Sequence, residues 1–186
     1  MNAMKKLIIL ILVLALIGGG YYWWTHRDTS TTSTGTTNTQ TNNTKPDPSN
    51  ATFNIEGDAV TLASGKNESA AAPGSAITEE TTLMEKLAYG DLNGDGKNDT
   101  ALLLARYGGG SGTFIYVAAY VSGTVTYKGS EATFLGDRIA PQSISINNSV
   151  ITVVYLDRGP DDSFAEEPTI RTTKAFVYKN GSLEEK

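Results

Sequence analysis

An uncharged apolar segment near the N-terminus constrains this chain more than any other feature. Residues 7–24 carry no charged side chain, begin as an unbroken apolar stretch over 7–17, and end on four consecutive aromatic residues at 21–24. At ~1.5 Å per residue, a helix of this length spans a hydrocarbon core of ~30 Å. Aromatic residues concentrate at the membrane interface, and Lys5 and Lys6 before the segment favour a cytoplasmic N-terminus. The pattern therefore predicts one transmembrane helix over about residues 7–24.

The same segment has a second interpretation. A cleaved signal peptide would use residues 7–17 as its apolar region and a cleavage site near Gly18-Gly19-Gly20. The span length and the aromatic belt favour an uncleaved signal anchor, which we place at residues 1–27. Both interpretations export the rest of the chain, so the expected location is the cell membrane, single-pass, with the remainder extracytoplasmic, either periplasmic or at the cell surface.

A Thr/Ser/Asn-rich stretch follows the anchor. Residues 28–50 contain no aliphatic or aromatic side chain, so they bury no apolar surface to offset the entropy of ordering. We expect a flexible stalk there, which ends near Lys45-Pro46-Asp47-Pro48 because proline interrupts regular structure. The folded domain is then residues 51–186.

The domain pattern is that of β-strands. Short apolar and alternating runs are separated by Gly and Asn, with little helical periodicity. We expect a mostly β fold, a single antiparallel β-rich domain, with α+β as the alternative because residues 81–89 also suit a helix; sandwich and barrel stay open. The wholly apolar run 101–105 is typical of a strand buried on both faces. Other expected strands are 52–55, 59–62, 81–89, 113–121, 124–127, 143–146, 150–155, 169–178 and 182–184.

The most specific motif is the stretch Gly90-Asp91-Leu92-Asn93-Gly94-Asp95-Gly96-Lys97-Asn98-Asp99. Calcium takes six to eight hard oxygen ligands, and a tightly coiled loop turns alternate side chains toward one point. The spacing predicts a Ca²⁺ site whose ligands are Asp91, Asn93, Asp95, the carbonyl of Lys97, and Asp99. The loop departs from an EF-hand, since Leu102 replaces the bidentate Glu. The alternative interpretation is an acidic Asx/Gly turn between two strands.

This motif resembles the calcium loops of FG-GAP/VCBS-type repeats and of dockerin-type modules. Together with GGGSGTFIYVAAY, FLGDRI and YLDRGPDD, it also resembles a group of bacterial exported or membrane-anchored domains that has no established activity. The resemblance implies a cell-envelope location and a calcium-stabilised module. Only one copy of the loop occurs, so a propeller fold is not implied.

Composition argues against several function classes. The chain has no Cys, and its one His, His26, precedes the domain, which excludes thiol and His-based catalysis and Cys- or His-ligated zinc from residues 51–186. Those residues carry 11 Lys and Arg against 18 Asp and Glu. Such an acidic surface repels phosphate backbones, so we expect no nucleic acid partner.

Two loops are candidate interaction surfaces. One is glycine-rich, Gly108, Gly109, Gly110, Ser111 and Gly112; the other is acidic and contains Asp157, Arg158, Asp161 and Asp162. The glycine-rich loop does not suit a phosphate loop, because a strand pattern follows the glycines and no Lys is present there. We expect a non-enzymatic binding or structural module of the bacterial cell envelope, whose partner is an envelope protein or polysaccharide. The alternative is a carboxylate-dependent hydrolase acting on envelope polysaccharide.

Overall fold

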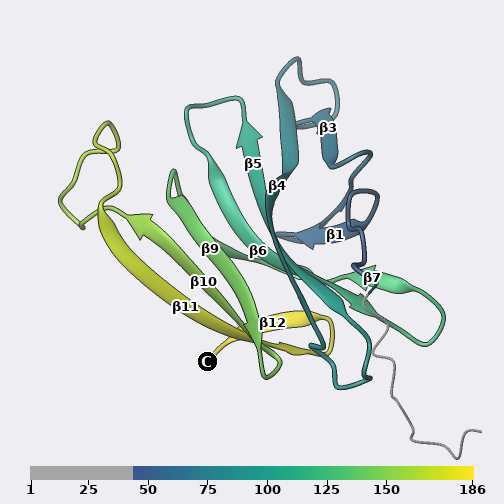
Figure 1. Cartoon of the computed structure of the whole chain (residues 1–186). Coiled ribbons are helices and arrows are strands. Elements are labelled where there is room, and N and C mark those ends of the chain that lie inside the picture. Colours follow the sequence, from purple (N-terminus) through teal and green to yellow (C-terminus); the bar gives the residue numbers. More distant parts are fainter. Residues whose placement is uncertain (1–43) are drawn as a thin grey trace, which may run out of the picture. The chain divides into compact units, whose positions relative to one another are not determined.

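The computed structural model describes residues 44–186, which form an all-β structure (Figure 1). The predicted transmembrane helix, and the predicted stalk as far as residue 43, lie outside the described residues. Within residues 44–186, no helix is long and apolar enough to cross a membrane.

Twelve strands form within these residues, and residues 81–89 belong to a strand, as expected. The strands are β1 (Thr52–Ile55), β2 (Asp58–Thr61), β3 (Lys66–Ala70), β4 (Thr78–Gly90), β5 (Asp99–Gly108), β6 (Phe114–Ser122), β7 (Tyr127–Gly129), β8 (Glu131–Asp137), β9 (Ala140–Asn147), β10 (Val150–Asp157), β11 (Ile170–Lys179) and β12 (Ser182–Glu185).

The larger sheet is curled almost into a closed barrel. Its strand order is β2-β1-β8-β6-β5-β4-β3, and β7 pairs with β6 beside this path. Neighbours are antiparallel, except that β1 and β8 run parallel where Asn54 and Ile55 pair with Glu131 and Ala132. The two edge strands come together at a bridge between Ala63 and Lys66. The interior of the curl is therefore enclosed by strands from both ends of this sheet.

Strand β5 is buried on both faces, which confirms the prediction for residues 101–105. Leu102 and Leu104 point into the curl, where they pack with Phe53, Ile55 and Tyr116 in one apolar core. The alternate residues of β5 face outward and belong to a second core. No side chain in 101–105 is more than 3% exposed, because each face of the strand is covered by a different layer.

The second core lies between the curled sheet and a four-stranded sheet of order β12-β11-β10-β9. Leu103 and Val117 of the first sheet pack with Ile151 and Phe176 of the second, and all four are fully buried. The sheets approach closely where Gly90 meets Ile146: a Cβ at residue 90 would lie 2.8 Å from Ile146 Cγ2. A side chain at that position would push the layers apart.

The two ends of the domain differ in what they carry. One end holds the β4–β5 loop and the β9–β10 turn, which meet where the Ser149 hydroxyl donates to the Asp91 carbonyl at 2.7 Å. The chain enters the domain at this end, because the Thr100 hydroxyl donates to the carbonyl of Pro46 at 2.7 Å. The β5–β6 and β10–β11 loops lie at the other end (Figure 1).

Residues 44–50, expected as the last part of the stalk, pack on the domain. Pro46 and Pro48 are buried, and Ser49 accepts a hydrogen bond from Gly65 N–H through its carbonyl at 2.7 Å. The Lys45 ammonium lies 5.1 Å from the centre of the Tyr89 ring. Contacts with the sheet therefore begin before Ala51.

Candidate functional sites

The β4–β5 loop is shaped by its own acidic side chains. Asp91 accepts hydrogen bonds from Gly94 N–H at 2.7 Å and from Gly96 N–H at 2.9 Å. Asn93 accepts from Asp95 N–H at 3.0 Å, and Asp95 accepts from Lys97 N–H at 2.9 Å. Gly94 and Gly96 both have φ near +80°, a conformation that glycine adopts without strain. The glycines and the Asx-type hydrogen bonds together coil the loop.

Ser122, at the end of β6, fastens the loop to the sheet. Its hydroxyl donates to Asp95 Oδ2 at 2.6 Å, and its carbonyl accepts from the Asn93 amide at 2.8 Å. The hydrogen bond from Ser122, and then the one from Lys97 N–H, hold the pKa of Asp95 below its ordinary value. The Lys97 ammonium lies 3.6 Å from Asp95 Oδ2.

Asp99 differs from the other predicted ligands because it is completely buried. Its two carboxylate oxygens accept hydrogen bonds from Leu92 N–H and from Ser122 N–H, each at 2.8 Å. Both oxygens are thus directed at backbone N–H groups, one in the loop itself and one at the end of β6. This geometry makes Asp99 an anchor between the β4–β5 loop, β5 and β6, and its part in binding calcium stays a prediction.

The residues that remain fit calcium in their donor chemistry. Asp91, Asn93 and Asp95 offer hard carboxylate and amide oxygens on one coiled loop, and Lys97 adds a backbone carbonyl. The fit is incomplete: within residues 44–186, no group of three or more His, Cys, Asp or Glu side chains is gathered closely enough to hold a metal ion. A cation at this loop would need water or backbone oxygens to complete its coordination.

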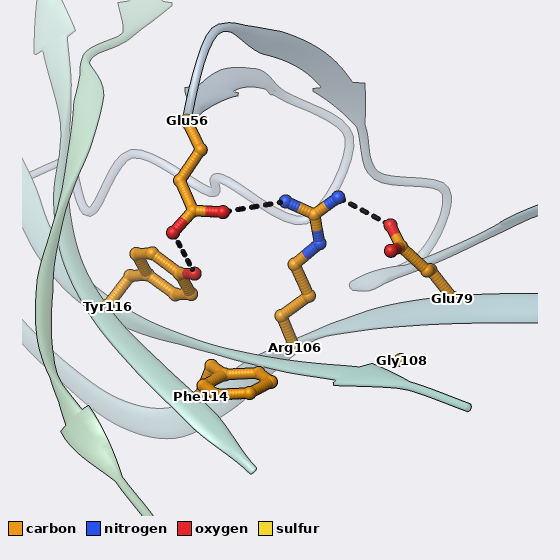
Figure 2. Close-up of a pocket in the computed structure, with 6 residues that line it drawn as sticks. All are labelled: Glu56, Glu79, Arg106, Gly108, Phe114 and Tyr116. Carbon is orange, nitrogen blue, oxygen red and sulfur yellow. Dashed lines mark hydrogen bonds and ion pairs between the residues drawn. The ribbon is translucent and has the colours of Figure 1, made fainter. Parts of the chain in front are cut away.

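A second site lies at the opposite end of the curled sheet. Six residues line a cavity of about 190 Å³ there: Glu56, Glu79, Arg106, Gly108, Phe114 and Tyr116 (Figure 2). With the adjoining Asp58 and Phe134 we call this cavity the mouth. Figure 2 shows the Arg106 guanidinium between the carboxylates of Glu56 and Glu79, with the rings of Tyr116 and Phe114 below them.

Arg106 is the centre of the mouth. It forms an ion pair with Glu79, and its guanidinium nitrogens lie 3.7 Å from Glu56 Oε2 and 3.7 Å from Asp58 Oδ2. Burial lowers the pKa of Arg106, but the hydrogen bond and charge of Glu79 outweigh this effect and raise it. The guanidinium is therefore a permanent charge, held in place by a side chain that is only 14% exposed.

Aromatic rings form one wall of the mouth. The Tyr116 hydroxyl donates to Glu56 Oε1 at 2.9 Å. Burial, and next this hydrogen bond, raise the pKa of Tyr116 to about 12, so the phenol keeps its proton. The Phe134 ring lies 5.5 Å from Tyr116 and 6.3 Å from Phe114, measured between ring centres. Phe114 and Phe134 are 37% and 47% exposed, so both rings are partly accessible to a ligand.

The predicted glycine-rich loop borders this mouth. Gly108 lines the cavity, and the loop that follows it is exposed up to Ser111. The loop is fixed at its far side, where Thr113 N–H donates to Asp137 Oδ1 at 2.8 Å. Gly108, Gly109, Gly110, Ser111 and Gly112 thus form a rim, whereas the polar groups of the mouth come from the strands and from the β1–β2 turn.

The acidic loop is held mainly by its arginine. Arg158 donates to the carbonyls of Arg138, at 2.8 Å, and Glu166, at 2.6 Å. Asp157 accepts from Arg158 N–H at 2.8 Å, and Asp162 accepts from Gly159 N–H at 2.7 Å. Asp161 is exposed. Most of these acids organise their own loop, and none lines the mouth cavity.

Sequence reasoning missed the mouth because its residues come from separate strands. Glu56, Glu79, Arg106 and Tyr116 form no local motif, and each charge has an ordinary neighbourhood in the sequence. The one available signal was Arg106, a charged residue placed directly after the apolar run 101–105. Comparisons with protein families, with curated proteins and with solved structures found no match for this chain.

Proposed function

We propose that this protein is a membrane-anchored, extracytoplasmic binding module of the bacterial cell envelope, stabilised by calcium at the β4–β5 loop and binding its ligand at the mouth. The observation that carries the proposal is the mouth itself: exposed Phe114 and Phe134 faces beside a fixed Arg106, in a cavity of about 190 Å³. Apolar walls with a few placed polar groups are typical of ligand pockets.

The positions of the two sites support this division of roles. The chain enters the domain beside the β4–β5 loop, where Thr100 holds Pro46, and the mouth lies at the other end of the strands. The mouth therefore lies away from the point at which residue 44 joins the domain. The loop contributes rigidity at the tethered end, because a bound cation would offset the repulsion between Asp91 and Asp95.

The carboxylate-dependent hydrolase is the second candidate, since Glu56 and Glu79 line one cavity. A glycosidase needs two carboxyl groups on either side of the bond to be cleaved. In the mouth, Arg106 occupies the space between these two side chains and pairs with both (Figure 2). This arrangement favours binding over hydrolysis.

The expected location can be tested with a single introduced cysteine, because the chain contains none. Val125 is 95% exposed, so Val125→Cys presents a thiol without disturbing the core. We expect a membrane-impermeant maleimide to label this variant in spheroplasts, with no increase after lysis. Labelling that appears only after lysis would place the domain in the cytoplasm and end the proposal.

Binding can be tested by sedimentation with insoluble peptidoglycan, using the full chain in lipid discs. We expect co-sedimentation that Phe134→Ala reduces several-fold and Asp161→Ala leaves unchanged, since Asp161 lies on the acidic loop outside the mouth. Release of reducing sugar from the same substrate, lost in Glu79→Gln, would favour the hydrolase instead.

A further inference from the structure

The mouth carries more negative than positive charge. Arg106 faces three carboxylates, those of Glu56, Asp58 and Glu79, which leaves two negative charges in excess. The cavity-lining residues include no second cation. An anionic ligand would therefore meet net repulsion, and a cationic ligand would meet net attraction.

The exposed rings point to the same class of ligand. A cation within about 6 Å of an aromatic ring centre is attracted by the electron-rich face of the ring. Phe114 and Phe134 are the partly exposed rings of the mouth, whereas Tyr116, 5.5 Å from Phe134, is itself buried. A metal ion would gain little from Phe rings, whereas an ammonium group with attached carbon atoms contacts rings and carboxylates together. We propose, building on the proposed function, that the mouth binds an organic cation, an ammonium group carried on an apolar or sugar body.

The pairing of the carboxylates leaves room for this ligand. Glu79 makes the close ion pair with Arg106, whereas Glu56 and Asp58 lie at 3.7 Å and their side chains are 64% and 74% exposed. Asp58 can turn toward an ammonium group, and Glu56 can offer its Oε2 while its Oε1 still accepts the Tyr116 hydroxyl, with Glu79 still neutralising Arg106. Exposed pairs at such distances contribute little to stability, so little is lost when they rearrange.

The cavity size limits what enters. Its volume of about 190 Å³ compares with the roughly 150 Å³ of an apolar cavity that holds one benzene ring. The mouth therefore accepts one ring-sized group, such as an amino sugar or a trimethylammonium head. Whether the cation is a free molecule or the amino sugar of a polymer, the recognised chemistry is the same.

The test uses two matched pairs of small probes, each consisting of a cation and a neutral analogue. Choline is paired with 3,3-dimethyl-1-butanol, and glucosamine with N-acetylglucosamine. The full chain is held in phosphatidylglycerol discs, whose lipid has no ammonium group, and empty discs are the blank. NMR shifts of the Arg106 side-chain N–H and of the Phe114 and Phe134 amides report binding at the mouth.

We expect at least one cation to shift these signals with a Kd in the millimolar range, at least tenfold tighter than its neutral analogue. Glu56→Gln keeps an acceptor for the Tyr116 hydroxyl but removes a charge, so it should weaken cation binding about fivefold. Glu68→Gln is the matched control: it removes the same charge from a residue that pairs with Lys66 outside the cavity. Comparing glucosamine with its oligomers distinguishes a free ligand from a polymer-bound one.

Two results would overturn the inference. They differ in whether the mouth is still supported as a binding site. Equal binding of neutral and cationic probes at the mouth would refute the ligand class but keep the mouth as a binding site. Cation recognition at the mouth would be refuted if none of the four probes shifted the signals of the mouth. It would also be refuted if Glu56→Gln and Glu68→Gln lost the same amount of cation affinity. Neither result affects the location test with Val125→Cys. A failure of the proposed function would therefore be detected separately from a failure of the ligand class.

Discussion

Removal of the Asp99 carboxylate should destabilise the domain more than removal of any exposed acid. Asp99 is completely buried and accepts the N–H groups of Leu92 and Ser122 at 2.8 Å each. In Asp99→Ala both N–H groups lose their acceptor, at a cost of about 1–3 kcal/mol for each buried group. The variant no longer has to bury the charged Asp99 carboxylate, and this gain offsets part of the cost. We expect a net loss of about 3 kcal/mol in the free energy of unfolding.

The assay is urea unfolding of residues 40–186, within which residues 44–186 form one compact unit. Asp99→Asn retains one acceptor oxygen, so its free energy of unfolding should lie between those of Asp99→Ala and the natural protein. Asp161→Ala, an exposed acid, serves as the control and should change stability by less than about 0.5 kcal/mol. If Asp99→Ala matched this control, the anchoring role of Asp99 would be refuted.

Three further predictions concern pH and packing. The hydrogen bonds from Ser122 and Arg138 lower the pKa values of Asp95 and Asp137, respectively, from 3.8 in the folded chain. Both carboxylates therefore add to the free energy of unfolding above pH 3.8, and this stabilisation is lost as the pH falls below it. Asp137→Asn should make stability less dependent on pH in this acidic range, and an unchanged dependence would contradict this. Tyr116 has its pKa raised to about 12, so stability should be full below pH 10 and fall between pH 10 and 12, and Tyr116→Phe should reduce that fall. Gly129→Ala should lower the melting temperature by several degrees, because its Cβ would lie 2.2 Å from the Thr52 carbonyl oxygen. Gly110→Ala, whose Cβ meets nothing closer than 3.6 Å, should have the same melting temperature as the natural protein.

Much of the strand content could be predicted from local pattern. Residues 101–105 show a continuous apolar run because each face of β5 meets a different core. The expected strands 52–55 and 59–62 also appear, as a hairpin of 52–55 with 58–61, and the β11–β12 turn has positive φ at both Asn180 and Gly181. The β9–β10 turn lies at Asn148–Ser149, because Asn147 still pairs with Val150.

The arrangement of the strands could not be predicted in the same way. The sequence of β3, Lys66–Ala70, is almost wholly polar, since this edge strand is largely exposed and has no alternating apolar face. The parallel pairing of β1 with β8 joins residues far apart in the chain. The mouth depends on this pairing, because Glu56 follows β1 and reaches Arg106 of β5 only when the sheet curls.

The β4–β5 loop shows how far residue spacing in the sequence predicts the positions of the side chains. Asp91, Asn93 and Asp95 do bend the loop around themselves, as expected for alternating oxygen-bearing residues. Asp99 has the same spacing, but it begins β5 and its carboxylate accepts the N–H groups of Leu92 and Ser122. The difference arises because Asp99 is already part of β5, so pairing within the sheet sets the direction of its backbone.

The measurement that tests the calcium-stabilised module most directly is thermal unfolding of residues 40–186 in EDTA and in millimolar calcium, with Asp95→Ala alongside. A site filled at 100 times its Kd adds about 2.7 kcal/mol to the free energy of unfolding, which is several degrees in melting temperature for a domain of this size. The account predicts such a rise, lost in Asp95→Ala. Equal melting temperatures in EDTA and calcium would contradict it and leave the loop as a hydrogen-bonded turn.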